Sequence, residues 1–498
     1  MFETGVAIKR GQRRKIRRLI AIGAAAAVVA AGGIVAGIKL TAGSDQCGAG
    51  VVKDGAECVG VTDGSYVFDP ALTAVEGDIL GENRAVAQET RDYVTLALFM
   101  PLTYSSGSDV SMARIRAELE GAYAAQSSLN GQGFRPAIRL LLANEGSTEQ
   151  AWSSVAGELA DEPASDNLVA VVGMGVSTLP TVQAARQFAG LGDPLPMIGT
   201  VITADGLDRT GPSAALVGTA LAGPIKGLVR VVPGVDQEVE DLLAYLRQQQ
   251  GLLTSVLLVK DTNQADLYTE SLGQDFQSRF ATYHERSDQY DGSPGSQVLA
   301  NEFTTIADAV CLSDAGGAPP TVLYAGREEL LPTFIDQLRG LTLCHGSTIT
   351  VVTGSDADAL PLSSTEANPT GPQINVVYAD IVDATQLSPA YTSAFRSIKG
   401  VVLADLDDAW AAETYDGVAA AELAVRDTAG ASSTVIPNRG AVMAELYDLN
   451  TPGNEISGAT GEIQIQPNGD ESCEGVPIVT DSGGSSTRTE AAPQPGCQ

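Results

Sequence analysis

Short apolar runs alternate along the chain with longer segments in which apolar residues recur every three or four positions. The runs are uninterrupted and rich in Val, Leu and Ile, as strands buried on both faces of a sheet are. Strands are predicted at 94–100, 137–142, 168–173, 196–199, 255–260, 321–325, 348–353 and 375–379. Amphipathic helices are predicted at 109–129, 148–159, 235–246, 268–280, 329–338 and 407–425. This alternation predicts an α/β fold with parallel sheets.

The series is interrupted at 221–232 (LAGPIKGLVRVV), which divides it into two halves. The chain has 498 residues, more than one hydrophobic core usually supports. We therefore expect two Rossmann-like lobes with a hinge and an interlobe cleft. Ligands of open parallel sheets bind beyond the carboxyl ends of the strands, so the loops at those ends are the candidate site.

A different pattern precedes the alternation. Residues 19–38 contain no charged side chain, and twenty helical residues span ~30 Å, the thickness of a bilayer core. Seven Lys and Arg residues lie before this segment. Positive charge stays on the cytoplasmic side, so we predict a single-pass anchor in the cell membrane, a cytoplasmic segment at 1–18 and an extracellular or periplasmic main domain. A cleaved signal peptide and a lipoprotein anchor at Cys47 are the alternatives.

The composition is acidic, with 61 Asp and Glu against 30 Lys and Arg and a net charge of −31. Such a surface repels nucleic acid and anionic lipid, and solubility is its simplest interpretation. Six cysteines in an exported chain indicate three disulfides, with fifteen possible pairings. Neighbourhood in sequence favours the pairs Cys47–Cys58, Cys311–Cys344 and Cys473–Cys497. No CxxC motif occurs and the two histidines are far apart, so neither a metal site nor a cofactor is expected.

Polar residues follow several predicted strands. Hydroxyl groups and backbone amides at helix N-termini suit a ligand carboxylate, and an acidic side chain from the other lobe suits an ammonium group. An ordinary helix cap is the alternative role of each Ser and Thr. Enzyme signatures such as G-x-S-x-G, a Walker loop or HExxH are missing, so the chain is not expected to be an enzyme. The candidate ligand residues in these loops are Thr103, Tyr104, Ser177, Thr178, Thr200, Thr203, Tyr268, Asp356 and Asp358.

Several strings resemble one family. They are VTLALFMPLTYSSG, VVGMGVSTLPTVQAA, PMIGTVITADGL, VLLVKDTNQADLYTESLGQDF and SGATGEIQIQPNGD. Their order is similar to that of the periplasmic binding protein type I fold, in the branched-chain amino-acid (leucine) binding group of ABC transporter substrate-binding proteins. The resemblance covers about 93–470 and includes no single diagnostic motif.

The resemblance implies a role for most candidate residues. Ser177 and Thr178 would bind the ligand carboxylate, with Thr200 or Thr203 sharing the carboxylate or the ammonium. Tyr268 would line the second lobe, and Asp356 or Asp358 would pair with the ammonium. Arg327 stands where the family often has an aromatic residue, and it would favour a ligand with an additional anionic group.

The same resemblance makes each lobe discontinuous in sequence. The first lobe would comprise 93–228 and about 354–428, and the second 229–353 and about 429–470, with hinges near 228, 354 and 428. A Gly- and Asp-rich stalk would occupy 39–92, and a mobile tail 471–498.

The predicted function is that of a membrane-anchored extracytoplasmic solute-binding protein. It would capture a small polar ligand, an amino acid or similar, and deliver it to an ABC permease. The alternative is a sensor or scaffold of the same fold that acts through a membrane partner. A third possibility is an envelope interaction module without a small ligand.

Overall fold

A computed structural model describes residues 46–89, 92–162, 166–293, 298–312, 319–430, 435–450, 453–471 and 475–489. The predicted anchor at 19–38 and the predicted pair Cys473–Cys497 lie outside these residues. Among the helices of the described residues, none is both long and apolar enough to cross a membrane.

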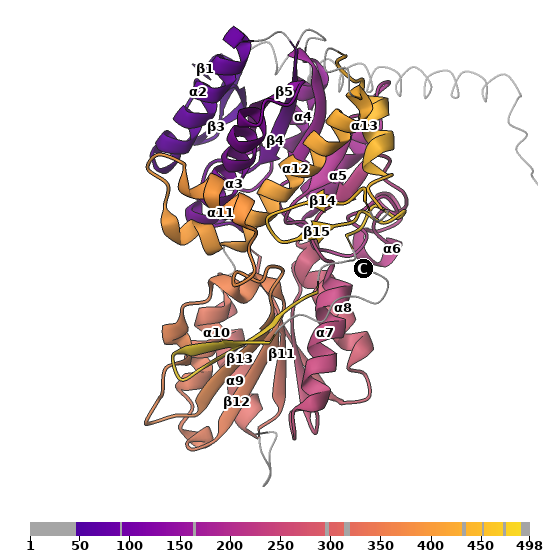
Figure 1. Ribbon diagram of the computed structural model, residues 1–498. Helices are drawn as coiled ribbons and strands as arrows, with labels where there is room; N and C mark the ends of the chain where they lie inside the picture. The colour runs from indigo at the N-terminus through magenta and orange to yellow at the C-terminus, as the bar shows by residue number, and fades with distance from the viewer. Residues whose placement is uncertain are drawn as a thin grey trace, which may run out of the picture. The chain divides into compact units, whose positions relative to one another are not determined.

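The first sheet is parallel at its centre and antiparallel at one edge (Figure 1). Strand β6 has the sequence LVAVVG and is buried at every position, as a strand covered on both faces must be. A short strand, β1 (Gln46–Gly48), precedes this sheet in the chain. The other strands, in sheet order, are β2 (Val51–Asp54), β3 (Glu57–Thr62), β5 (Ala137–Asn144), β4 (Tyr93–Met100), β6 (Leu168–Gly173), β7 (Met197–Gly199) and β8 (Leu228–Arg230).

The second sheet repeats this arrangement, with four adjacent parallel pairings and an antiparallel hairpin at one edge. The α/β class is confirmed, but both sheets are mixed rather than parallel throughout, because a hairpin adds to each. The strands, in sheet order, are β10 (His284–Tyr290), β9 (Val256–Asp261), β11 (Thr321–Ala325), β12 (Thr348–Thr353), β13 (Gln373–Ala379), β16 (Ile478–Ser482) and β17 (Ser485–Arg488).

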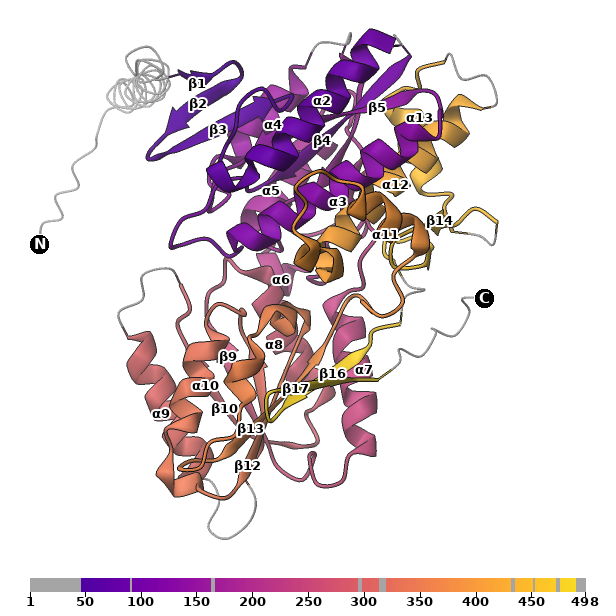
Figure 2. The ribbon, with the colours of Figure 1, turned by 60° about the vertical axis from the view of Figure 1, so that its left-hand side comes forward.

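Helices cover both sheets, and segments far apart in the chain share one sheet (Figures 1 and 2). The helices associated with the first sheet are α2 (Thr73–Glu89), α3 (Met112–Gly131), α4 (Trp152–Ala160), α5 (Leu179–Ala189), α6 (Ala214–Val217), α11 (Pro389–Arg396), α12 (Ala409–Ala429) and α13 (Arg439–Leu446). Those of the second sheet are α7 (Val235–Gln248), α8 (Leu267–Arg279), α9 (Leu299–Leu312) and α10 (Leu331–Arg339). Short elements are η1 (Pro70–Leu72), η3 (Thr342–Cys344), η4 (Ser355–Ala359), η5 (Leu362–Thr365), η6 (Leu403–Asp407), β14 (Ile456–Ser457) and β15 (Glu462–Ile463).

The chain passes between the sheets three times. It leaves the first sheet after β8, returns to it after β13 and leaves again between β15 and β16. We call residues 51–230 and 389–463 the first lobe, and residues 235–379 and 478–488 the second lobe. The boundaries predicted at 354 and 428 are therefore wrong. Strand β13 pairs with β12 in the second sheet, and α13 contacts β6 of the first.

The two ends of the described chain are also integrated into the lobes. Strand β3 hydrogen-bonds to β5, and α2 contacts α3, so 51–89 is part of the first lobe rather than a stalk. Strand β16 pairs with β13, so 478–488 is part of the second sheet rather than a mobile tail. Tight turns at Gly55 and at Gly483–Gly484, all with positive φ, close the two hairpins.

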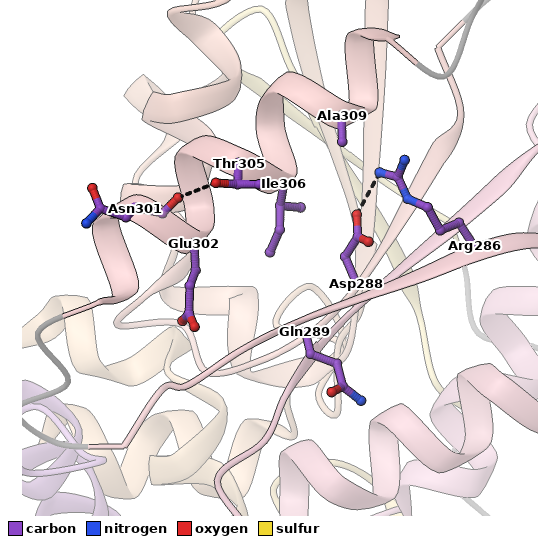
Figure 3. Close-up of a pocket in the computed structure, with 8 residues that line it drawn as sticks. All are labelled: Arg286, Asp288, Gln289, Asn301, Glu302, Thr305, Ile306 and Ala309. Atoms are coloured by element: carbon purple, nitrogen blue, oxygen red, sulfur yellow. Dashed lines mark hydrogen bonds and ion pairs between the residues drawn. The ribbon is translucent and has the colours of Figure 1, made fainter.

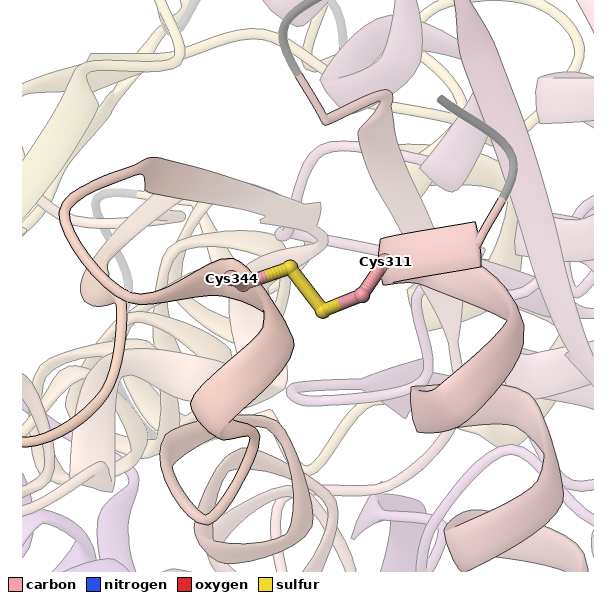
Figure 4. Close-up of a disulfide and its surroundings, with 2 residues drawn as sticks. All are labelled: Cys311 and Cys344. Carbon is pink, nitrogen blue, oxygen red and sulfur yellow. A yellow bond between two sulfur atoms is a disulfide. The ribbon is translucent and has the colours of Figure 1, made fainter. Parts of the chain in front are cut away.

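The disulfide predicted between Cys311 and Cys344 is present (Figure 4). It joins the last turn of α9 to η3, with 5.6 Å between the two Cα atoms. Cys47 and Cys58 are disulfide-bonded as well, and no described cysteine is free. The described cysteines thus agree with the predicted disulfides.

Helices α3 and α12 approach each other closely at one glycine. A Cβ atom on Gly121 would lie 2.0 Å from the backbone oxygen of Ala411. Helix α12 is in turn held against the first sheet at Gly417, where a Cβ atom would lie 2.5 Å from Thr200 Cγ2. Only glycine allows these two backbones to lie so close.

We therefore expect Gly121→Ala to destabilise the fold by about 1–3 kcal/mol, because the two helices must separate. Gly77→Ala is the matched control: it lies within α2, and an added Cβ meets nothing within 4 Å. That substitution should stabilise the fold by up to about 1 kcal/mol. Equilibrium urea unfolding of both variants measures the difference, and equal effects would contradict the close approach.

Candidate functional site

The two lobes meet at a crossing of two backbone segments. The segment 176–179 follows β6 in the first lobe, and 265–268 follows β9 in the second. The amide of Leu179 donates to the carbonyl of Ala265 at 3.0 Å, and the amide of Leu267 donates to that of Ser177 at 2.9 Å. The side chain of Leu267 belongs to the core of the first lobe. A loop that follows a strand of the first sheet is thus hydrogen-bonded directly to a loop that follows a strand of the second.

Asp266 is the centre of this crossing. Its carboxylate caps α8 by accepting hydrogen bonds from the amides of Tyr268 and Thr269 at 3.1 and 3.3 Å. The same carboxylate accepts two hydrogen bonds from the guanidinium of Arg327, at 2.7 and 2.9 Å. Arg327 also lies over the ring of Tyr268, 4.8 Å from its centroid, and 3.9 Å from Asp356. Both members of the ion pair are buried.

A second arginine connects the lobes. Arg114 of α3 forms an ion pair with Asp358 and donates to the backbone oxygen of Asp356 at 3.2 Å. Its guanidinium stacks on Trp410 of α12, 4.6 Å from the ring centroid. One side chain therefore joins two helices of the first lobe to the loop after β12 of the second.

The carboxylate of Glu149 lies at the N-terminus of α5. Its carboxylate accepts a hydrogen bond from the amide of Val176 at 2.8 Å and another from the hydroxyl of Thr178. Glu149 has a positive φ of 57°, which is uncommon for a residue with a side chain. Gly175 leaves room for it, since a Cβ atom there would lie 2.2 Å from Glu149 Oε1. The loop thus directs an acidic side chain of the protein toward a set of anion-binding donors.

A second carboxyl group lies beside Glu149. A Cβ atom on Gly175 would lie 2.7 Å from Glu145 Oε1 as well, so the two carboxyl groups approach the same point. Glu145 is fully buried, and neither of its carboxyl oxygens has a hydrogen-bond partner among the described residues. Burial, together with mutual repulsion, raises the pKa of Glu145 well above its usual range, and burial also raises that of Glu149. Two acidic side chains thus lie side by side at this edge of the first lobe, and burial favours their protonated forms.

Two adjacent cavities lie between the lobes. They have volumes of about 170 and 150 Å³ and share Gly107, Asp109, Asn263 and Asp266. We call them the interlobe cavities. The first is lined by Ser106, Gly107, Ser108, Asp109, Asp261, Asn263, Asp266, Gly292, Ser293, Leu299, Arg327, Glu329 and Leu330, and the second by Gly107, Asp109, Thr148, Glu149, Gln150, Thr178, Pro180, Asn263, Ala265 and Asp266. All these loops follow carboxyl ends of strands, where the topology predicts a site.

The structure brings four of the predicted residues together. Thr178 forms a backbone bridge with Asp266, and Tyr268 and Arg327 contact Asp266 directly. Asp356 adjoins them through Arg327, and Asp358 through Arg114. Ser177 is buried at the crossing, where its hydroxyl accepts from the amide of Ala204 at 3.1 Å.

The other predicted residues lie elsewhere. Thr103 donates to Glu57 of β3, and Tyr104 is 55% exposed. Thr200 is buried beside α12, and the carbonyl of Thr203 accepts from the amide of Val235 where the chain enters the second lobe. None of these four residues lines the interlobe cavities.

Sequence reasoning missed Asp109, Arg114, Glu145, Glu149 and Asp266. The helix predicted at 148–159 begins only at Trp152, because the preceding residues form a loop with Glu149 in a left-handed conformation. An acidic residue near a predicted helix start resembles an ordinary partner of the helix dipole, so no signal distinguished Glu149 or Asp109.

A larger hollow of about 370 Å³ lies away from the crossing, between β10 and α9 (Figure 3). Its charges are Arg286, Asp288 and Glu302, and the first two form an ion pair on the surface. The hollow is lined by one edge strand and one helix of the second lobe alone. Its position therefore differs from that expected for a ligand held by two lobes.

Comparison with solved structures identifies the fold. A leucine-binding protein of Thermotoga maritima MSB8 superposes with a TM-score of 0.58 at 17% identity, covering 81% of this chain and 99% of that one. A branched-chain amino-acid transporter binding protein of Streptococcus pneumoniae, in complex with isoleucine, gives 0.57 at 16%, covering 80% and 99%. An ABC transporter solute-binding protein of Rhodopseudomonas palustris BisB5, in complex with 3,4-dihydroxybenzoic acid, gives 0.57 at 16%, covering 82% and 100%.

The chain therefore has the type I periplasmic binding protein fold, as the sequence resemblance implied. No family model and no curated protein matches the sequence. No group of His, Cys, Asp and Glu among the described residues has an arrangement that could hold a metal ion.

Because Asp266 is buried against Arg327, we expect Asp266→Asn to destabilise the protein by about 3 kcal/mol, since it leaves a buried guanidinium without its anion. The matched control is Asp288→Asn in the exposed pair with Arg286, whose loss should change stability by less than about 1 kcal/mol. Urea unfolding separates the two effects. Equal losses would show that the Asp266–Arg327 pair does not hold the crossing together.

Stability should fall as the pH rises from 5 to 9. Burial raises the pKa of Asp109 to about 6, of Glu328 to about 7 and of Glu238 to about 8. The folded chain then retains protons that the unfolded chain releases near pH 4–5, so this stabilisation is present at low pH and is lost as pH rises through 6–8. Thermal unfolding across this range measures it, and a higher midpoint at pH 9 than at pH 5 would contradict it.

Proposed function

We propose that this protein is an extracytoplasmic solute-binding protein that captures a small ligand between its two lobes. This proposal rests on the position of the interlobe cavities, which lie beyond the carboxyl ends of strands from both sheets. Each cavity is smaller than the ~300 Å³ at the lower end for drug-sized ligands, which supports a small solute. Residues on both sides close around such a solute when the lobes rotate about the three connecting segments.

The proposal includes the membrane and an importer. The uncharged segment at 19–38, preceded by basic residues, supports an anchor that keeps the binding lobes close to a membrane partner. The similar proteins include ABC transporter binding proteins solved with isoleucine and with an aromatic acid. An ABC permease is accordingly the proposed partner, to which the loaded protein delivers its solute.

A scaffold that holds no solute is the second candidate. The observation that favours it is the set of interlobe bonds made by the chain itself, including the backbone crossing at Ser177 and the Arg114–Asp358 pair. In such a protein the lobes form one rigid surface, and the partner reads that surface rather than a bound molecule.

Ligand-induced stabilisation distinguishes the two functions. The full-length purified chain is heated with a panel of amino acids, aromatic acids and aliphatic amines, each at millimolar concentration. A transported solute should raise the unfolding midpoint by several degrees, because a ligand that binds only the folded state stabilises it. The midpoint should rise further with each tenfold increase in ligand. If no member of the panel shifts the midpoint, solute capture is contradicted and the scaffold is favoured.

A further inference from the structure

The position best suited to a ligand carboxylate is already filled by the protein. At the N-terminus of α5, the amide of Val176 and the hydroxyl of Thr178 both donate to Glu149. These are the donors that a carboxylate ligand would need at a helix N-terminus. A ligand with a carboxylate would have to displace a side chain that the loop at Gly146–Ala151 holds in place. That loop is fixed by the hydrogen bond from the amide of Ala151 to the carbonyl of Glu145 at 3.0 Å.

The remaining lining is rich in acids. The residues that line the interlobe cavities include five acids and a single base, Arg327. The guanidinium of Arg327 donates two hydrogen bonds to Asp266. Asp109 lines both cavities. Five carboxyl groups of the lining thus share one guanidinium.

Glu145 lies beside Glu149, next to the lining of the second cavity. It is buried without a hydrogen-bond partner among the described residues, and it points to the same place beside Gly175 as Glu149. A buried carboxyl group without a partner is costly unless something binds against it or near it. A positive charge beside Glu149 would stabilise both carboxyl groups at once.

The cavities also have an apolar side. Leu299 and Leu330 line the first, and Pro180 and Ala265 line the second. A lining that combines carboxyl groups with aliphatic groups suits a ligand whose charged end is attached to a short hydrocarbon chain. A hydrated inorganic cation would gain nothing from these aliphatic contacts.

We infer that the ligand is a small aliphatic amine without a carboxylate, whose ammonium group lies between Asp109 and Glu149 and whose hydrocarbon chain lies along Leu299 and Leu330. This inference rests on the proposed function and names the class of its solute. The Glu149 side chain excludes amino acids by occupying the carboxylate position. Asp109, which lines both cavities, supplies a carboxylate for the ammonium group.

Isothermal titration of the full-length chain tests the inference. The probes are putrescine and n-butylamine as amines, leucine as a zwitterion, benzoate as an anion and calcium chloride as an inorganic cation. An amine should bind, and leucine and benzoate should not bind at the same concentrations. In the Asp109→Asn variant the Kd for the amine should rise about tenfold or more, because a charged hydrogen bond is lost.

A second test variant and a control follow. Glu149→Gln keeps the size of the side chain and one acceptor oxygen, for the amide of Val176, while its amide nitrogen can donate to the hydroxyl of Thr178. The charge is removed, so amine binding should weaken while the midpoint of unfolding stays high enough to measure. Glu240→Gln removes a charge from a side chain of α7 that is 67% exposed, and amine binding should not change. Circular dichroism of each variant verifies the fold.

The outcomes separate the two proposals. Binding of leucine or benzoate with no binding of amines overturns the amine assignment and leaves solute capture standing. Binding of calcium with the same dependence on Asp109 overturns the organic class of the ligand. Amine binding that Asp109→Asn and Glu240→Gln change equally overturns the site. Absence of binding by every probe overturns the inference, and the thermal panel then decides whether any solute is captured.

Discussion

The structure depends on one buried ion pair at the place where the two lobes meet. Asp266 both caps α8 and binds Arg327, so the orientation of a helix and the neutralisation of a buried charge rest on the same carboxylate. That carboxylate lies on the segment whose backbone bonds to 176–179 of the first lobe. Removing it would release the helix, the guanidinium and the crossing together, whereas most surface charges can be lost singly.

The crossing also explains why the protein supplies its own groups where a solute would otherwise be bound. Thr178 is held beside Asp266 by the bridge between the two segments, and its hydroxyl then meets Glu149. Asp266 also binds the guanidinium of Arg327, which lies over the ring of Tyr268. Five of the residues that line the interlobe cavities are acidic and one is basic, so the acidic composition of the whole chain has a local counterpart there.

The sequence predicted the buried strands well because their apolar runs are uninterrupted; β6, β11 and β12 lie where the pattern places them. It missed β10, whose sequence HERSDQY is that of a polar edge strand, and the hairpins of β2–β3 and β16–β17. Of the residues predicted to bind a ligand, Thr178 and Arg327 line the interlobe cavities, and Tyr268 and Asp356 lie against Arg327; their role in binding stays a prediction. The predicted site could not include Glu149 or Asp109, since their importance arises from a left-handed turn and from contacts between lobes that are distant in sequence.

If a positive charge completes the interlobe cavities while Glu149 keeps its place, crystals of the protein grown with putrescine will show where that charge lies. We expect a nitrogen atom of the diamine within hydrogen-bond distance of the carboxylates of Asp109 and Glu149, with Glu149 still bound to Val176 and Thr178. A diamine bound elsewhere, or a structure with leucine in which the amino-acid carboxylate has displaced Glu149 from Thr178, would contradict it.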